Sequence, residues 1–473
     1  MRSKLIAGPA ATVLGVLLHG ACGGGSPAAP PVSSPTPAPR VRPNLVVIVA
    51  DDLDVPTTAE MPLLPDLLAS RGLSFTRAYA SQPVCAPSRA SIFTGQYTHN
   101  HGVAGNHFPE GGFPVFRRHE QATVAIWLKN AGYRTSLIGK YMNDYPEGAG
   151  DAYVPPGWDD WFGHMSALED GRYFNYWVND NGNVDRFGAT QADYSADVEA
   201  ARAVRFIRDA VTRPEPFFLY LGPEAPHEPA HYAERFGAEF RYSLAPRPPS
   251  FNEGDVNDKP SWVRQTELLT DEAIDRTDHF QRFRLRSLRA VEDMIAGVLQ
   301  ALDETGTLDR TYVFFVSDNG LLMGQHRVVG RKGNPYEETI RVPLMVRGPG
   351  VSVGTVDAFV LNVDLAPTLL QLAGASVPDT VDGKSLVPFF SGAPPSSWRK
   401  EVLIENYGAG PSYALRTADW LYNHQDTEEL ELYDMQQDPF QIQSLHRKVE
   451  PSFLEPFEQR IKTLLACRGP SCT

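Results

Sequence analysis

The sequence predicts an α/β fold built on a mostly parallel sheet flanked by helices, with a small C-terminal α+β subdomain. Three apolar runs, at 44–50, 216–221 and 311–317, have the composition of strands buried on both faces. Amphipathic helical patterns separate these runs, and buried strands that alternate with helices are typical of a parallel sheet.

The other elements follow in chain order. Shorter apolar runs at 134–138 and 342–346 are predicted strands. Helical periodicity predicts helices at 64–71, 123–131, 198–210 and 278–305. The pattern then changes, and short antiparallel strands are expected at 401–406, 413–417 and 420–423, with a closing helix at 455–465. We therefore expect a main domain over 42–397 and a subdomain over 398–473.

Polar clusters follow four of the five predicted main-domain strands. These clusters contain Asp51 and Asp52, Lys140, His227, and Asp318 and Asn319. A single Asp after a strand would be an ordinary turn residue, but the carboxyl ends of parallel strands meet at one edge, where ligands bind. Four clusters at that edge predict an active site.

Composition excludes several classes of protein. Hydrophobic residues make up 42% of the 473 residues, so the chain can bury a sizeable core. The formal net charge of −14 argues against nonspecific binding to nucleic acid. Four cysteines are too few for a disulfide scaffold at this length.

The N-terminal segment has the features of an export signal. Arg2 and Lys4 precede an apolar stretch at 6–18, and small residues lead to Cys22. This resembles a bacterial lipoprotein processing site, in which the cysteine is lipidated, although His19 occupies a place usually taken by an aliphatic residue. We expect a signal peptide over 1–21 and a Gly/Pro/Ser-rich tether over 22–41, with plain secretion as the alternative.

The most specific motif begins at Cys85 and reads CAPSRASIFTG over residues 85–95. It resembles the signature of the type I, formylglycine-dependent sulfatases, which implies an alkaline-phosphatase-like fold. In that family the cysteine is converted to Cα-formylglycine. One hydroxyl of the hydrated aldehyde attacks sulfur, and the second later expels sulfate as the aldehyde re-forms.

The resemblance also implies a cation site. Asp51 and Asp52 match the family's first pair of metal ligands, and Asp318 and Asn319 match the second. With an oxygen of the modified Cys85 they form an all-oxygen set. Such a set favours a hard cation, Ca²⁺ or Mg²⁺.

Four further residues match catalytic positions of the family. Arg89 is expected to stabilise the hydrated aldehyde, and Lys140 and Lys332 are expected to bind the sulfate. His227 is a candidate to protonate the departing alkoxide. Asp318 could also accept the proton of the attacking hydroxyl.

One position departs from the arylsulfatase pattern. Met142 stands two residues after Lys140, where arylsulfatases commonly have a histidine, and methionine cannot act as a base. His227, a water molecule or Asn143 would have to take over that role. The Gly-Lys-Tyr-Met-Asn segment instead resembles the N-acetylglucosamine-6-sulfatase and heparan 6-O-sulfatase branch.

Substrate contacts are less specific in the sequence. The candidates for direct contact with a sugar are His101, Asn106, Asn143 and His326. Capping and turn hydrogen bonds would equally explain the residues near the signature. Trp158, Trp161, Tyr173 and Tyr176 could stack on a sugar ring or pack in the core.

The last two cysteines, Cys467 and Cys472, lie in a short tail. An oxidising location would allow them to pair into a small loop.

Taken together, the resemblance implies an exported sulfuric ester hydrolase. Its expected substrate is a sulfated carbohydrate, with glucosamine 6-O-sulfate favoured, and its other partners are a formylglycine-generating enzyme and the membrane, through the lipid anchor only. One alternative is a phosphonate or phosphodiester hydrolase of the same superfamily. Another is a non-catalytic surface protein that binds glycans, which would follow if Cys85 stays a thiol.

Overall fold

The computed structural model describes residues 11–13, 15, 42–168, 171–392, 395–408 and 410–472. The chain divides into residues 1–41 and residues 42–473, and the following account concerns the second unit. The expected signal peptide, the lipidation site at Cys22 and the tether fall outside the described residues, apart from 11–13 and 15. None of the helices in the described ranges is long and apolar enough to cross a bilayer.

A large sheet forms the centre of this unit. In the described part of the chain it has ten strands. In sheet order they are β10 (Gly354–Leu361), β2 (Leu73–Tyr79), β9 (Leu344–Arg347), β8 (Thr311–Ser317), β1 (Asn44–Ala50), β7 (Phe217–Gly222), β3 (Arg134–Gly139), β4 (Asp160–His164), β5 (Trp177–Asp180) and β6 (Asn183–Arg186). Only β9 and β5 run against the others, so the sheet is mostly parallel, as predicted.

Both faces of the sheet are buried. Along β1, Val47 packs into one hydrophobic core and Val46 into the other, because successive strand side chains point to opposite faces. The first core is closed by α3 (Cys85–Thr94), α6 (Val124–Asn130) and α11 (Leu365–Ala373). The second is closed by α7 (Ser195–Ala210) and α9 (Asp271–Glu304). This layered arrangement confirms the predicted α/β class.

Short helices lie in the connections between these layers. They are α1 (Val55–Thr58), α2 (Leu64–Leu67), α4 (Thr98–His101), α5 (Gly112–Phe116), α8 (Ser261–Arg264) and α10 (Glu337–Ile340). The helix expected at 64–71 is broken in two, with α2 followed by a 3-10 turn over Ala69–Arg71.

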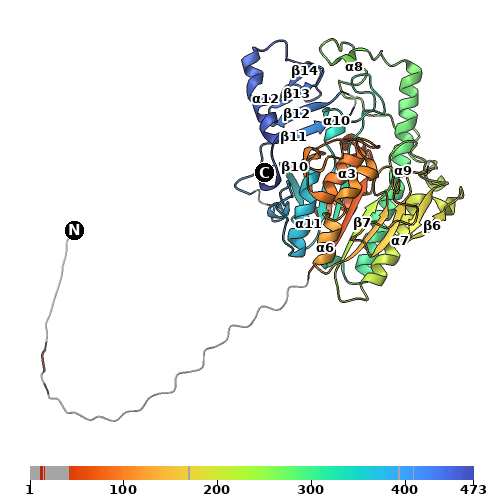
Figure 1. The fold of residues 1–473 in the computed structure, drawn as a ribbon, viewed down its shortest axis with the longest axis vertical. Coiled ribbons are helices and arrows are strands. Elements are labelled where there is room, and N and C mark those ends of the chain that lie inside the picture. The colour runs from red at the N-terminus through yellow and green to blue at the C-terminus, as the bar shows by residue number, and fades with distance from the viewer. Residues whose placement is uncertain are drawn as a thin grey trace, which may run out of the picture. The chain divides into compact units, whose positions relative to one another are not determined.

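A smaller antiparallel sheet follows, drawn in blue with α12 (Pro451–Leu465) in Figure 1. Its strands are β11 (Glu401–Asn406), β12 (Ser412–Thr417), β13 (Trp420–Gln425) and β14 (Leu430–Asp434), paired in that order. They share a third core with α12 and with residues of the main sheet, including Tyr79 and Phe359. The predicted α+β subdomain is therefore present, and it packs directly on the main domain.

Candidate active site

Four neighbouring strands of the large sheet end at the edge that carries the predicted site. β8, β1, β7 and β3 lie next to one another and run parallel, so their carboxyl ends meet. The segments leaving these ends carry Asp318 and Asn319, Asp51 and Asp52, His227, and Lys140, respectively. Separate parts of the chain thus supply one cluster.

Cys85 is the first residue of α3 and is fully buried beside the acidic pair. Its thiol donates to Oδ1 of Asp51 at 3.2 Å, and its Sγ accepts from Nζ of Lys332 at 2.7 Å. Burial and then the Asp51 carboxylate raise the pKa of the Cys85 thiol far above its ordinary value. The unmodified thiol is therefore a poor nucleophile at neutral pH.

The oxygen atoms beside Cys85 fit a divalent cation. Ligand atoms of Asp51, Asp52, Cys85 and His227 all lie within 4.8 Å of one another. Oδ1 of Asn319 is buried and has no hydrogen-bond partner among the described residues, as expected of an atom that faces a cation. Carboxylate and amide oxygens are the ligands that Ca²⁺ and Mg²⁺ take.

The carboxylates also influence one another's protonation. Burial and then the neighbouring Asp51 raise the pKa of Asp318 to about 7.

The backbone of Asp52 adopts a left-handed conformation, with φ of 64°, that is uncommon for residues other than glycine. Backbone strain of this kind concentrates at functional sites.

Two lysines and a histidine face these carboxylates. Lys140 forms an ion pair with Asp51, and Lys332 forms one with Asp52. Nε2 of His227 lies 3.6 Å from Oδ2 of Asp52, while its Nδ1 donates to the carbonyl oxygen of the next residue at 2.8 Å. Burial alone would raise the pKa of Asp51, but Lys140 and the other cations hold it well below its ordinary value.

Arg89 lies one helical turn after Cys85 and is completely buried. Its Nε donates to Oδ2 of Asp318 at 2.9 Å, and its Nη1 donates to the carbonyl oxygen of Lys140 at 3.0 Å. Its Nη2 is buried with no hydrogen-bond partner among the described residues, 3.9 Å from Oδ2 of Asp51. This nitrogen is available to a group at the cluster.

Sequence reasoning missed one residue that supports the acidic pair. Arg284 of α9 is fully buried and donates to the carbonyl oxygen of Asp52 at 2.6 Å and to Oδ2 of Asp54 at 2.7 Å. Asp54 also accepts from the backbone N–H of Thr57 at 2.8 Å and caps α1. An arginine amid the apolar positions of a long helix was the signal that could have found it.

A second missed group lies behind Lys140. Glu224 is buried, with its Oε2 4.0 Å from Nζ of Lys140 and its Oε1 3.6 Å from Nδ1 of His164. Nε2 of His164 lies 3.0 Å from Oε1 of Glu199. Burial alone would lower the pKa of His164, but the nearby carboxylates of Glu199 and Glu224 raise it to about 9. No motif marks these residues.

The residues predicted to touch a sugar have different surroundings. His101 is enclosed: its Nε2 lies 3.1 Å from Oγ of Ser91, and its Nδ1 accepts from the backbone N–H of Val103. We therefore correct that expectation, because both ring nitrogens serve the packing around α3. Oδ1 of Asn106 accepts from the backbone N–H of Ala86 at 2.9 Å and holds the start of α3.

Asn143 and His326 remain candidates. Oδ1 of Asn143 and Nε2 of His326 are buried without hydrogen-bond partners among the described residues. Nδ1 of His326 lies 2.7 Å from Oε2 of Glu253, and its ring stacks on Tyr336 with centroids 4.1 Å apart.

The aromatic cluster and Met142 belong to the core. Trp158, Trp161 and Met142 are buried in the first hydrophobic core and Tyr173 in the second, so packing explains them. The hydroxyl of Tyr173 donates to the carbonyl oxygen of His227 at 2.5 Å. It thereby holds the loop that carries the candidate acid.

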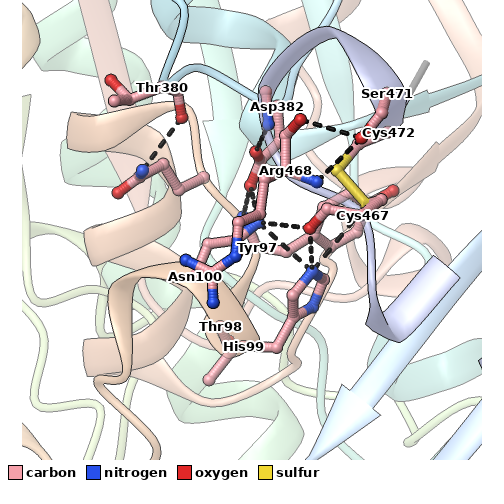
Figure 2. The surroundings of a disulfide bond; sticks show 12 residues. Tyr97, Thr98, His99, Asn100, Thr380, Asp382, Cys467, Arg468, Ser471 and Cys472 are labelled. Carbon is pink, nitrogen blue, oxygen red and sulfur yellow. Dashed lines mark hydrogen bonds between the residues drawn. A yellow bond between two sulfur atoms is a disulfide. The ribbon is translucent and has the colours of Figure 1, made fainter.

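Cys467 and Cys472 form a disulfide, as the sequence allowed (Figure 2). Nε2 of His99 and Nδ2 of Asn100 each lie 3.1 Å from the carbonyl oxygen of Cys467. These polar residues after the signature helix therefore fasten the C-terminal tail.

Comparison with known proteins identifies the family. A family model described as sulfatase matches residues 43–375, and one described as N-sulphoglucosamine sulphohydrolase, C-terminal, matches residues 324–465. The chain belongs to the sulfatase family. Sulfatases are hydrolases, and the chain groups with the N-acetylglucosamine-6-sulfatase branch.

Relatives cover nearly the whole of this sulfatase. The human N-acetylglucosamine-6-sulfatase is 35% identical over 91% of this chain and 86% of its own length. The N-acetylglucosamine-6-O-sulfatase of Bacteroides thetaiotaomicron is 26% identical over 86% of this chain and 83% of its own. A solved structure described as a complex with its substrate D-glucosamine-2-N,6-O-disulfate has a TM-score of 0.76 at 24% identity, covering 90% of this chain and 97% of that chain. The fold is thus shared across the family.

Proposed function

We propose that this sulfatase hydrolyses the 6-O-sulfate ester of a glucosamine unit in a sulfated glycan. The observation that carries the proposal is Cys85 at the start of α3, enclosed by Asp51 and Lys332 at the edge of a sulfatase fold. The named activity of the human and Bacteroides relatives supports the choice of sugar and position.

We propose that Cys85 is converted to formylglycine by a dedicated enzyme. The hydrated aldehyde would supply an oxygen nucleophile, which the thiol, with its raised pKa, does not. Arg89 supports this assignment because its buried Nη2 has no partner among the described residues and could donate to a hydroxyl there.

Asp51, Asp52, Asp318 and Asn319 would hold the divalent cation, Ca²⁺ or Mg²⁺. When bound, the cation supplies positive charge that screens the repulsion between a sulfate ester and an oxygen nucleophile. Lys140 and Lys332 would bind the sulfate oxygens as charge-assisted donors. Nδ1 of His227 donates to a backbone carbonyl, so a doubly protonated ring would carry on its Nε2 the proton for the departing alkoxide.

We also propose that the protein is exported and anchored through a lipid on Cys22, with residues 22–41 as the tether. The disulfide between Cys467 and Cys472 supports export, because disulfides persist in oxidising compartments.

Sulfate release from a panel of monosaccharide sulfates tests the proposed function. We expect the highest kcat/KM on N-acetylglucosamine 6-sulfate, with the 3-sulfate and galactose 6-sulfate as positional and sugar controls. A preference for aryl phosphodiesters over aryl sulfates would favour the phosphonate or phosphodiester hydrolase alternative. Binding of sulfated glycan without sulfate release by fully modified protein would favour a non-catalytic role.

A further inference from the structure

Two cavities lie next to each other, and Arg172 lines both. The smaller, about 200 Å³, is also lined by His164, Ser166 and Glu224. The larger, about 820 Å³, is also lined by Asn175 and His231. Neither cavity has a role in the chemistry proposed for Cys85.

Glu224 links the cavities to the catalytic cluster. Nη1 of Arg172 donates to Oε2 of Glu224 at 2.9 Å, and the same oxygen lies 4.0 Å from Nζ of Lys140. The Glu224 carboxylate therefore contacts Arg172 and also lies near Lys140, the lysine assigned to the sulfate. Its side chain keeps 33% of its surface exposed, whereas those of Lys140 and Glu224 are almost completely covered.

Several charged side chains meet around Glu224. Lys140, Arg172 and the charged form of His164 all face this single carboxylate. Glu199 offsets His164, and Asp51 offsets Lys140, but Asp51 also belongs to the proposed cation site. The partly exposed side chain of Arg172 lines both cavities, and a guanidinium offers five donors in a fork that matches sulfate and carboxylate.

We propose that Arg172 is a specificity-determining residue that binds a second anionic group of the substrate, beside the sulfate that is hydrolysed. The ligand class is a sulfated sugar with a further sulfate or carboxylate one ring position or one sugar unit away. The inference rests on the proposed function, since it takes the first sulfate to lie at Cys85. Arg172 would then favour doubly anionic substrates over singly anionic ones.

The test compares substrates that differ only in the second anion. kcat/KM would be measured for wild type and Arg172→Gln on glucosamine 6-sulfate carrying either an N-acetyl or an N-sulfo group. A disaccharide with an adjoining uronate, against its neutral counterpart, distinguishes a carboxylate from an N-sulfate as the second anion. The preference is the ratio of kcat/KM on a doubly anionic substrate to kcat/KM on its singly anionic counterpart. We expect Arg172→Gln to reduce this ratio by roughly 10- to 100-fold for one of the two pairs, the range of a lost hydrogen bond to a charged group.

Two controls separate recognition from positioning. Arg205→Gln removes one exposed positive charge from α7 and should leave the preference unchanged. Arg172→Lys keeps the charge but loses the fork, so it should restore only part of the preference. Equal losses on singly and doubly anionic substrates in Arg172→Gln would overturn the proposal, because Arg172 would then act only by holding Glu224.

Binding provides a readout that does not depend on turnover. Calorimetry with N-sulfoglucosamine, which lacks the 6-sulfate, should show weaker binding to Arg172→Gln than to wild type. Equal binding to both proteins would contradict the inference even if 6-sulfate hydrolysis is established. Absence of hydrolysis with intact Arg172-dependent binding would instead count against the proposed function alone.

Discussion

Two buried clusters in this sulfatase contain the same kinds of residue but differ in how their charges are satisfied. One surrounds Cys85 at the strand ends. The other joins α4 to the C-terminal tail and contains His99, Asp382, Glu405 and the disulfide (Figure 2). Each brings together a histidine and cysteine sulfur within reach of one another.

In the tail cluster every carboxylate oxygen has a donor from the protein. Oε1 of Glu405 accepts from His99 and from the hydroxyl of Tyr407, and its Oε2 accepts from the backbone N–H of Thr98. Asp382 accepts through both of its oxygens as well. Because its carboxylates are matched by donors that join α4 to the C-terminal tail, we interpret this cluster as structural.

In the Cys85 cluster the carboxylates face one another. Asp51 raises the pKa of Asp318, and buried atoms of Asn319 and Arg89 lack partners among the described residues. Carboxylates crowded in this way fit a site that binds a cation. The comparison teaches that carboxylates and basic side chains crowded around one thiol, rather than residue types, distinguish the Cys85 cluster from the tail cluster.

The largest expected effect is a loss of sulfate release when the Cys85 cluster, but not the tail cluster, is altered. Cys85→Ala leaves nothing to convert to an aldehyde, so kcat/KM for sulfate release should fall by at least about 10³-fold. His99→Gln, the control in the tail cluster, should keep nearly full activity. Sulfate release by Cys85→Ala at wild-type rates would contradict the assignment of the nucleophile.

The second prediction concerns the pH dependence of the stability that His164 contributes. His164 faces two carboxylates and His99 faces one. The pKa of His164 in the folded protein is raised to about 9, so its contribution is complete below about pH 6.5 and is lost as pH rises through about 9. Denaturant unfolding should therefore show His164→Gln less stable than wild type by up to about 3 kcal/mol at pH 6, with the gap closing towards pH 9.5. A gap that grows with pH would refute the charged state of His164.

The third prediction concerns the divalent cation. A chelator should abolish sulfate release and lower the melting temperature, because a ligand at 100 times its Kd stabilises by about 2.7 kcal/mol. Asp382→Asn should be less stable throughout yet respond to the chelator as wild type does. Thermal scans with and without added Ca²⁺ or Mg²⁺ measure both effects, and an unchanged melting temperature would argue against the cation site.

The smallest effect is expected from the tail. Replacing Cys467 and Cys472 together by serine should lower the free energy of unfolding by about 2 kcal/mol, the loop-entropy value for so short a loop. Activity should not change, because the tail cluster fastens the C-terminus. A loss of activity at temperatures where the variant remains folded would show that the clusters are coupled.

Much of the fold could be predicted because the central strands are locally distinctive. β1 and β8 are unbroken apolar runs, and the structure reproduces their predicted bounds. β2 and β10 escaped prediction because exposed polar residues interrupt them. The run at 342–346 overlaps β9, but the antiparallel direction of β9 depends on its pairing with β2 and β8, which no local pattern records.

The candidate site, like the fold, could be predicted only in part. The structure brings together the residues at strand ends and in the signature that the family resemblance had singled out. Glu224, His164 and Arg172 were missed because each is a single charged residue whose meaning comes only from its neighbours in space. His101 was assigned to the wrong role, since proximity in sequence to Cys85 does not show which way a side chain points.

The most direct test of the central claim is mass spectrometry of the tryptic peptide covering residues 78–89, from protein purified from its native host. We predict a peptide lighter by the change from thiol to aldehyde at Cys85, in protein that releases sulfate. An unmodified thiol in protein that still releases sulfate would contradict the account. The proposed mechanism needs the hydrated aldehyde at Cys85 as the nucleophile, and a buried thiol cannot supply it.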